Sequence, residues 1–386
     1  MNNINYSDFK KDIEIIKSDI DNISSELCMN HFYKIKYTCD FFYFTGLMFL
    51  FLSPYFVFPW LFLALGIFGK WTMIGHHVCH GGYDNISNNK YHRRKFGIKT
   101  GFRRFMDWFD WWYVEAWNIE HNNLHHYNLG EDSDPDLLEN NFTWRYLNIP
   151  IFIKKIMIIF IACVWKWLYY APNTYKYYCL NKLKRKDEKL YEKISNKHSG
   201  ATFTIRAYIL YYEDWMSGLF THVLFPYFAY MFICIPLIWY GISILLKLNS
   251  YNIMYNVYVN LVLAEIFTNI HSFLVIATNH CGEDLYRFNT HVEPRSGEFY
   301  LRQIISSTDY NAGNDVIDFL QGWLNYQIEH HLFPDLSMLQ YRMVMPKIKK
   351  ICKKYNIPYV QENVFIRLKK TVDIMTGEKS MKKFNY

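Results

Sequence analysis

Histidine is concentrated in three short windows of the sequence. They read GHHVCHGG, EHNNLHH and QIEHH, and together they contain eight of the 15 histidines. Within the first two windows, His76 and His80 are four residues apart, as are His121 and His125. Residues four apart lie on nearly the same face of a helix, so each pair can direct two imidazoles toward one point. Imidazole-rich sites suit iron, zinc or copper.

The second and third windows also contain adjacent histidines, His125-His126 and His330-His331. Adjacent residues on a helix point about 100° apart, so a doubled histidine suits two neighbouring targets, with one imidazole for each. Two spaced pairs and two adjacent pairs therefore predict a two-metal centre with neutral nitrogen ligands. Carboxylate di-iron bundles carry a Glu-x-x-His repeat, and no glutamate stands three residues before a histidine of these windows. The pattern points away from a ferritin-like site.

Five polar residues in or near the windows are candidates for supporting the ligands. The tripeptide Ile-Glu-His occurs in two windows, which places Glu120 and Glu329 next to a histidine. Each glutamate either orients a ligand histidine or is solvated. The acidic stretch GEDSDPDLLE follows the second window, and Asp134 and Asp136 have the same two interpretations. Gln327 opens the third window, and because an amide is a poor iron ligand, we expect it to hydrogen-bond a ligand or a bound water.

Two further histidines, His271 and His280, lie at the end of an apolar segment. Nine residues separate them, which puts them on opposite faces of a helix, so at most one can face the site. His280, in the sequence TNHCGED at the polar edge, is the better placed. The histidines outside these motifs are expected at the surface or at interfaces: His31, His92, His198, His222 and His291.

The composition indicates that these windows belong to a membrane protein. Hydrophobic residues make up 51% of the chain and charged residues 20%, below the roughly 25% of soluble proteins. Residues 41–69 carry no charge across 29 positions, and about 20 apolar residues cross a bilayer. The Ser53-Pro54 break therefore predicts a hairpin of two spans beginning near Tyr33. Residues 216–247 and 252–279 predict a second hairpin.

The remaining segments are more polar. Residues 1–32 are expected to form a cytosolic amphipathic helix, because apolar residues recur in them at helical spacing. Residues 151–171 are apolar but interrupted by three lysines, which favours a helix at the membrane interface. A polar, Lys-rich loop is expected between about 173 and 200, and a cytosolic tail over 361–386.

Basic residues gather in three clusters that flank the apolar segments, around 93–104, 182–189 and 347–354, within a net charge of +7. Two hairpins place all three clusters on one side of the membrane, which the positive-inside rule identifies as the cytosol. Nucleic-acid binding is the weaker explanation. The predicted fold is an all-α polytopic membrane protein with about four transmembrane helices in two hairpins and a cytosolic helical cap that holds the metal site.

The three windows have the order and form HxxxH, HxxxHH and QxxHH, which resembles the histidine boxes of the membrane fatty acid desaturases over roughly residues 40–360. The string GWLNYQIEHHLFPDL is similar to the third box of the front-end acyl and sphingolipid branch, where glutamine replaces the first histidine. Two features depart from that branch. Its second box is usually HxxHH, and its members commonly carry a fused cytochrome b5 domain marked by His-Pro-Gly-Gly, a motif this sequence lacks.

The resemblance implies a membrane desaturase domain over residues 33–360. It implies an enzyme with two iron ions that uses O2 and two electrons to introduce a double bond into a fatty acyl or sphingolipid chain. Electrons would come from a separate donor, cytochrome b5 with its reductase, at an active site facing the cytosol from the endoplasmic reticulum. Carried over residue by residue, the ligands are His76, His80, His121, His125, His126, His280, His330 and His331.

Other interpretations share parts of this pattern. A membrane di-iron hydroxylase acting on a lipid or carotenoid would have the same boxes and would differ in its product. A non-enzymatic, zinc-binding multi-pass membrane protein would differ in its metal. The aromatic run WFDWWYVEAW at 108–117 either lines an acyl channel or forms an interfacial belt.

Overall fold

A computed structural model describes residues 4–21, 23–98, 107, 112–197, 200, 216 and 218–384. The described chain is mostly helical, which confirms the prediction of a helical protein. Its strands are two-residue pieces in two parallel pairs: β1 (Tyr286–Arg287) with β4 (Lys382–Lys383), and β2 (Asp309–Tyr310) with β3 (Gln361–Glu362).

The helical elements are α-helices, labelled α, and short 3-10 or π-helical stretches, labelled η. Those of the N-terminal half are α1 (Tyr6–Asp21), α2 (Ser25–Met48), η1 (Pro54–Phe56), α3 (Phe58–Gly69), η2 (Lys70–Gly75), α4 (His76–His80), α6 (Val114–Trp117), η3 (Asn118–His125), α7 (Leu138–Asn141), η4 (Thr143–Tyr146), α8 (Ile151–Cys163), η5 (Lys166–Tyr170), α9 (Ala171–Lys186) and α10 (Glu188–Lys197). Those of the C-terminal half are η8 (Leu219–Leu224), α11 (Phe225–Ala229), η9 (Tyr230–Cys234), α12 (Ile235–Leu245), α13 (Ser250–Ile276), α14 (Gly297–Ile305), α15 (Asp315–Leu320), α16 (Gln327–Leu332), α17 (Met338–Lys354) and α18 (Val364–Thr376).

Three continuous helical segments of the described chain are long and apolar enough to cross a membrane: Phe58–His80, Leu219–Leu245 and Ser250–Ile276. The predicted break near Pro54 is present as the short helix η1. A fourth span is not confirmed. Helix α2 packs along α3 where the first leg of a hairpin was expected, but it carries Lys34, Lys36 and Asp40.

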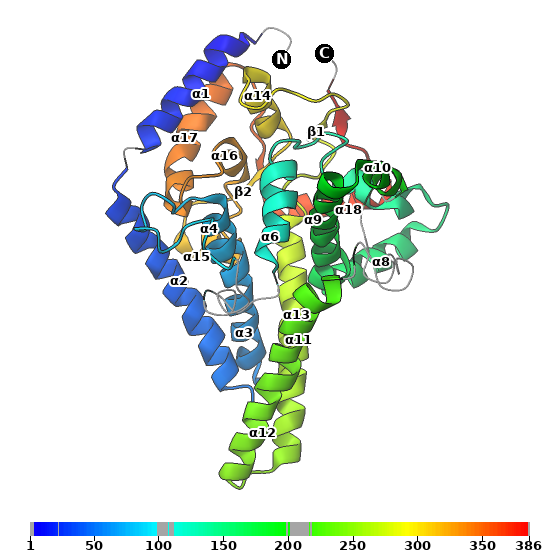
Figure 1. Ribbon diagram of the computed structural model, residues 1–386. Coiled ribbons are helices and arrows are strands. Elements are labelled where there is room, and N and C mark those ends of the chain that lie inside the picture. The colour runs from blue at the N-terminus through cyan, green and yellow to red at the C-terminus, as the bar shows by residue number, and fades with distance from the viewer. Residues whose placement is uncertain are drawn as a thin grey trace.

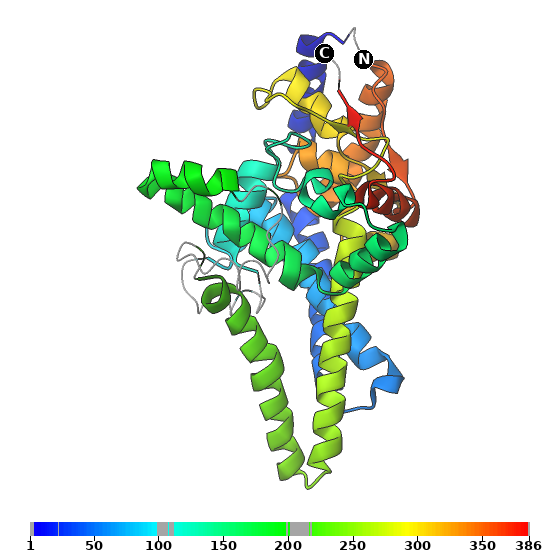
Figure 2. The same cartoon turned by 90° about the vertical axis from the view of Figure 1, so that its right-hand side faces the viewer.

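The second expected hairpin is visible as two long helical legs. The first leg is Leu219–Leu245, which ends with α12, and the second leg is the first part of α13. Figure 2 shows both legs extending away from the rest of the molecule, with both chain termini at the opposite end. The α12 leg exposes large apolar side chains such as Leu237, Ile238, Ile244 and Leu245. An apolar surface of this extent is unfavourable in water and suits contact with lipid.

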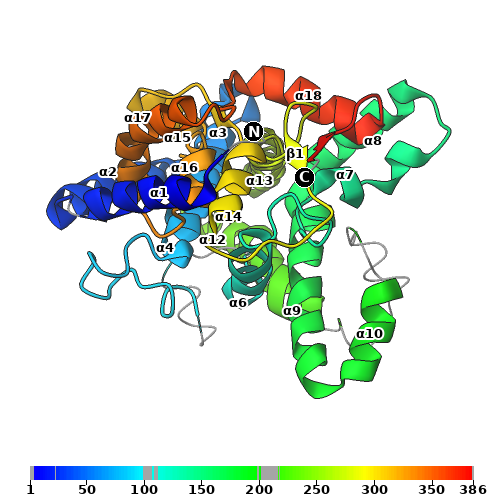
Figure 3. The same cartoon turned by 90° about the horizontal axis from the view of Figure 1, so that it is seen from above.

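The end of the molecule that carries the termini is a layer of packed helices (Figure 1). Helix α1 has the predicted amphipathic pattern and buries Phe9, Ile13, Ile16 and Ile20. It packs on α17 and α14, and the view from above shows α1 alongside α17 (Figure 3).

The prediction of a loop between about 173 and 200 is wrong, because the described part of this segment forms helices α9 and α10. Its apolar residues Tyr175, Cys179 and Leu180 recur at helical spacing and are buried, while the lysines at the end of α9 are exposed. Because lysine is frequent in this segment, its composition did not predict a buried apolar helix face. Asp187, in an extended conformation, separates the two helices.

Two lysines of the 151–171 segment are buried rather than interfacial. Lys154 Nζ donates to the carbonyl oxygens of Arg145, at 2.8 Å, and Thr376, at 2.9 Å. Lys166 Nζ lies 2.8 Å from Glu265 Oε2, and this lysine is fully buried. Partners inside the protein therefore stabilise two lysine charges that the sequence predicted to lie at the membrane–water interface.

Helices α2 and α3 approach each other at two glycines. A Cβ atom at Gly46 would lie 2.4 Å from the backbone nitrogen of Leu63, and one at Gly66 would lie 2.5 Å from Cα of Tyr43. These distances are too short for any side chain, so the glycines permit a backbone contact that helix pairs in membranes commonly use. The contact supports the helix that ends in the first histidine window.

We expect Gly46→Ala to destabilise the protein by about 1–3 kcal/mol, because the added methyl group forces the two backbones apart. Thermal unfolding of the detergent-solubilised protein measures the effect as a lower melting temperature. Gly241→Ala is the matched control, since a Cβ atom at this glycine of α12 meets nothing within 4 Å. Equal melting temperatures for the two variants would contradict the close approach.

Candidate metal centre

The first histidine window ends the long helix that begins at Phe58. His76 and His80 lie one turn apart on α4, with their Nε2 atoms 3.2 Å from each other. Gly81, in a left-handed conformation with φ of 94°, ends the helix directly after His80. The predicted convergence of these two imidazoles on one point is present.

The second window lies on a π-helical turn, not on a regular α-helix. The turn η3 covers Asn118–His125, and the His126 nitrogen donates to the His121 carbonyl at 3.1 Å, five residues back. The ring of His121 is 4.9 Å, between centroids, from the rings of both His125 and His126. The wider turn therefore brings both adjacent histidines next to the same partner, which the regular α-helical geometry assumed from the sequence does not describe.

The third window and His280 meet from different segments. His331, on α16, places its Nε2 atom 3.0 Å from Nε2 of His280, in the turn after α13. The side-chain nitrogen of Gln327 is 2.9 Å from the same His280 atom. Asn279 donates to the Gln327 side-chain oxygen at 3.0 Å. Gln327 is thus placed beside a candidate ligand, where its expected role requires it to be.

The eight candidate ligands form adjoining groups. Each group offers nitrogen atoms that lie within 4.8 Å of one another: His76, His80, His121 and His330 in the first, and His125, His280 and His331 in the second. His126 forms a third group with His330 and His331 and so connects the other two. Two neighbouring groups of imidazoles are the arrangement that a pair of adjacent metal ions would need.

Several buried ring nitrogens in these groups have no hydrogen-bond partner among the described residues. They include both nitrogens of His121 and of His126, and Nε2 of His330. An unpaired polar atom in a protein interior is costly, so a set of them converging on one region requires an explanation. Coordination of a first-row transition metal by imidazole would supply it, and the residues present fit such ions.

The electrostatic surroundings keep these imidazoles neutral. Burial, followed by neighbouring imidazoles, holds the pKa of His121, His126, His330 and His331 well below the usual value of 6.5. A neutral imidazole has a free lone pair on one nitrogen, which is the form that binds a metal.

His125 differs because a carboxylate faces it. Asp134 Oδ1 lies 2.8 Å from His125 Nδ1, and the backbone nitrogens of Gly130 and Asp136 both donate to Asp134 at 2.9 Å. Burial alone would lower the pKa of His125, but the charge and hydrogen bond of Asp134 reverse the direction and raise it. The contact holds the proton on Nδ1 and leaves Nε2 for a metal.

The other three acidic candidates are placed differently. Asp136 Oδ2 lies 3.8 Å from His121 Nδ1, and Asp136 also forms a possible ligand group with His121 and His125. Both carboxylate oxygens of Glu120 are buried and have no hydrogen-bond partner among the described residues. Burial and the nearby Asp136 and Asp134 raise its pKa.

Glu329 directs its hydrogen bond away from the histidines. The Tyr359 hydroxyl donates to Glu329 at 2.9 Å and also contacts Asp309. Burial and the Asp309 carboxylate raise the pKa of Glu329. Asp309 in turn accepts a hydrogen bond from the backbone N–H of Ile328 at 3.0 Å, which anchors the start of α16.

Two supporting residues have no signal in the sequence. The Tyr341 hydroxyl lies 3.1 Å from His330 Nδ1, and Gln303 Oε1 lies 3.2 Å from His331 Nδ1. Tyr341 lies on α17 and Gln303 on α14, outside the three histidine windows. Asn279 could have been found, because it precedes His280 in the TNH motif.

The remaining histidines near the centre lie outside the groups. His77 is buried with its ring 5.6 Å from that of Tyr341. His271 donates to the Leu320 carbonyl at 2.6 Å and stacks on Phe68 at 3.9 Å between ring centroids. As helical periodicity predicted, only one of His271 and His280 faces the centre.

A cavity adjoins the histidine groups. Its walls include His76, His121, His125 and His280, and its aromatic side chains are Trp71, Trp165, Tyr169 and Tyr170. Of the aromatic run at 108–117, residues 108–111 lie outside the described residues. Trp117 stacks on His121, with ring centroids 4.5 Å apart, and contacts Trp112. That part of the run therefore packs against the centre.

Comparison with known proteins identifies the family of this chain. A family model described as "Fatty acid desaturase" matches residues 52–363, which include every candidate ligand. The chain belongs to the fatty acid desaturase family.

Curated relatives in the family match over shorter stretches. The chain is 34% identical over 113 residues to an NADPH-dependent stearoyl-CoA 9-desaturase of Mycobacterium tuberculosis, covering 28% of this chain and 26% of that protein. It is 34% identical over 86 residues to the Delta(5) fatty acid desaturase A of Dictyostelium discoideum, covering 21% and 18% of the two chains. It is 35% identical over 91 residues to the Delta(6)-fatty-acid desaturase fat-3 of Caenorhabditis elegans, covering 24% and 20%. No solved structure matches.

We expect Asp134→Asn to lower metal affinity by roughly 10- to 100-fold. Both carboxylate oxygens of Asp134 accept hydrogen bonds from His125, Gly130 and Asp136, and an amide has only one oxygen to accept them. Metal analysis of the purified variant measures the loss. Asp132→Asn is the matched control, since Asp132 is exposed and its side chain accepts a hydrogen bond from Asn140. Metal contents that are equal in the two variants would refute a role of Asp134 in orienting a ligand.

Proposed function

We propose that this chain is an O2-dependent desaturase with two iron ions that introduces a double bond into the acyl chain of a lipid, either a fatty acyl chain or a sphingolipid. The observation that carries the proposal is the convergence of eight imidazoles from four separate segments into adjoining groups beside an aromatic cavity. Membership of the fatty acid desaturase family supports the same reaction.

In this proposal the ions are held by the eight ligands named above, with the third window contributing His330 and His331. Two bound iron ions would supply, from O2 and two electrons, the oxidising power that an unactivated methylene group requires. The protein holds the acyl chain beside the centre and excludes water, and Trp71, Trp165 and Tyr169 on the cavity wall suit both tasks. Asp134 keeps the His125 proton on Nδ1, so that Nε2 would be free to bind a metal ion.

Electrons would come from a separate donor, for which cytochrome b5 with its reductase is the candidate. A second, more polar opening reaches His80, His126 and His331, and its walls include Arg93, Arg94 and Arg295. A basic opening suits an acidic partner. The proposed membrane desaturase domain covers residues 33–360, after an N-terminal cytosolic segment over 1–32. The proposed cytosolic tail over 361–386 packs against this domain through β3 and α18. The proposed location is the endoplasmic reticulum, with the centre facing the cytosol.

Expression in a desaturase-deficient yeast, followed by profiling of fatty acids and sphingolipid bases, tests the reaction. We expect a new alkene with the unaltered chain, and none with His125→Ala or His331→Ala, because each variant deletes a ligand. His291→Ala is the matched control, since His291 is exposed and lies outside the groups.

Three outcomes contradict the proposal. A hydroxylated product without an alkene would identify a hydroxylase. Bound zinc with no iron and no new product would identify a non-enzymatic metal-binding protein. Full activity of both histidine variants would remove the assigned ligands from the reaction.

A further inference from the structure

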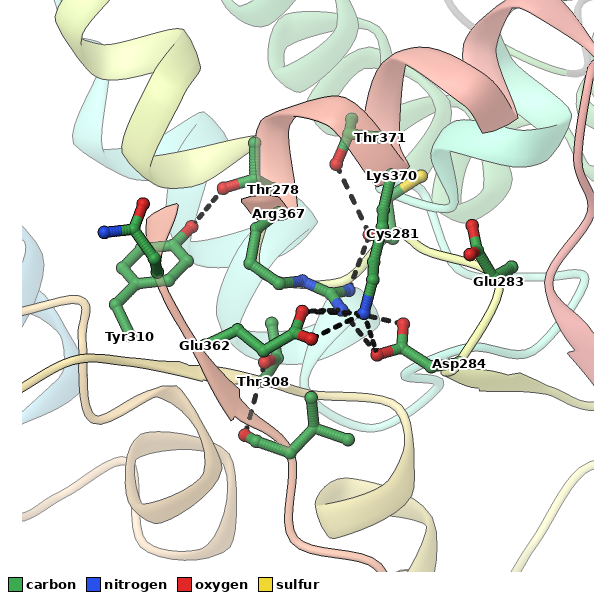
Figure 4. A network of polar contacts seen from close by, with 12 residues as sticks. Thr278, Cys281, Glu283, Asp284, Thr308, Tyr310, Glu362, Arg367, Lys370 and Thr371 are labelled. Atoms are coloured by element: carbon green, nitrogen blue, oxygen red, sulfur yellow. Dashed lines mark hydrogen bonds and ion pairs between the residues drawn. The ribbon is translucent and has the colours of Figure 1, made fainter. Parts of the chain in front are cut away.

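The turn that carries His280 is held by the C-terminal helix α18. The backbone carbonyl of Cys281, the next residue, accepts a hydrogen bond from Arg367 Nη2 at 2.8 Å and another from the Thr371 hydroxyl at 3.3 Å. Both donors lie on α18, one turn apart (Figure 4). They therefore fix the backbone directly beside a candidate metal ligand.

Arg367 is itself held in place by two carboxylates. It is fully buried, and its Nη1 atom lies 2.7 and 2.8 Å from the two oxygens of Asp284 and 3.3 Å from Glu362 Oε2. Lys370 binds the same two carboxylates, with contacts of 2.8 Å to Asp284 and 2.7 Å to Glu362 (Figure 4). A planar guanidinium bound at several points has a fixed orientation, and its burial is tolerated because it is paired.

The sequence of the turn leaves space for this contact. A Cβ atom at Gly282 would lie 2.4 Å from Arg367 Nη2, so only glycine admits the guanidinium at this distance from the backbone. The opposite side of the turn is held as well. Thr308 donates its backbone nitrogen to the Asn279 carbonyl at 3.0 Å, and the Tyr310 hydroxyl contacts the Thr278 side chain. The His280 turn thus lies between the β2 segment and α18.

We infer that Arg367 is a positioning residue for the metal centre, which sets the place of His280 relative to His125 and His331. The inference rests on the proposed role of His280 as a ligand. His280 faces its partners closely, with ring centroids 5.0 Å from His125 and 4.5 Å from His331. A small displacement of the turn would open this group, and metal sites lose affinity when the residues that support a ligand are removed. Arg367 lies outside residues 52–363, the part that the family model matches.

Metal binding by the whole 386-residue chain in detergent tests the inference. The metal-free protein is titrated with Co²⁺, and visible absorption follows each bound ion. We expect Arg367→Met to weaken one ion by at least about tenfold and to leave the other unchanged, as His280→Ala does. Lys370→Met is the matched control on the same helix, because it removes contacts with the same carboxylates and leaves the Cys281 carbonyl bonded. It should bind both ions as the unaltered protein does.

The double variant Arg367→Met/His280→Ala separates positioning from general stability. If Arg367 acts through His280, the double variant binds as weakly as His280→Ala alone, because the two effects do not add. Additive losses, or unchanged binding of both ions by Arg367→Met, would overturn the inference. If Arg367→Met does not fold, Arg367→Lys and Thr371→Val replace it. Each should weaken the same ion by a smaller factor, and unchanged affinity in both would also overturn the inference.

The titration reads the metal, and product analysis reads the reaction, so the two proposals fail separately. Two ions in the unaltered chain, the expected Arg367 result and a hydroxylated product would contradict only the proposed desaturation. An alkene product with Arg367→Met binding both ions normally would contradict only the positioning role. An unaltered chain that binds no pair of ions would overturn both.

Discussion

Burying many imidazoles in one place is the constraint on which the rest of this structure depends. Several neutral imidazoles can bind one metal ion only if their lone pairs converge, and convergence brings together polar atoms that are costly to bury in a protein interior. The chain meets this requirement with short elements of several kinds that end or bend at the centre. Gly81 stops the first helix, a wide turn carries the second window, and Asp309 anchors the start of α16. The long apolar helices supply the frame from which these elements project.

Local spacing predicted the features that local spacing determines. The amphipathic pattern of α1, the break near Pro54, and the choice of His280 over His271 all follow from helical periodicity and turn chemistry. The pairing of His76 with His80 does as well. Each depends on residues within about two turns of one another. Such patterns are set by neighbouring residues and do not require knowledge of contacts with distant segments.

Features set by contacts between distant segments could not be read in this way. Tyr341 and Gln303 support ligands from helices that no motif marks. The sequence places Lys166 at the membrane–water interface, whereas in the structure it is buried and paired with Glu265. In helices α9 and α10 the lysines outnumber the apolar residues of the buried face, so the composition indicates a loop where the structure has two helices. For the two ligand-supporting residues and for Lys166, the missing information is the identity of a partner, which composition and spacing do not encode.

The wide turn of the second window changes the meaning of its unusual spacing. On a regular helix, a histidine shares a face with the residues three and four positions later, which is the arrangement HxxHH provides. On the π-helical turn seen here, His121 is equally near the residues four and five positions later, His125 and His126. One inserted residue and one widened turn therefore cancel. The same three imidazoles can be presented to one site, and the difference between HxxHH and HxxxHH is a difference in the number of residues per helical turn.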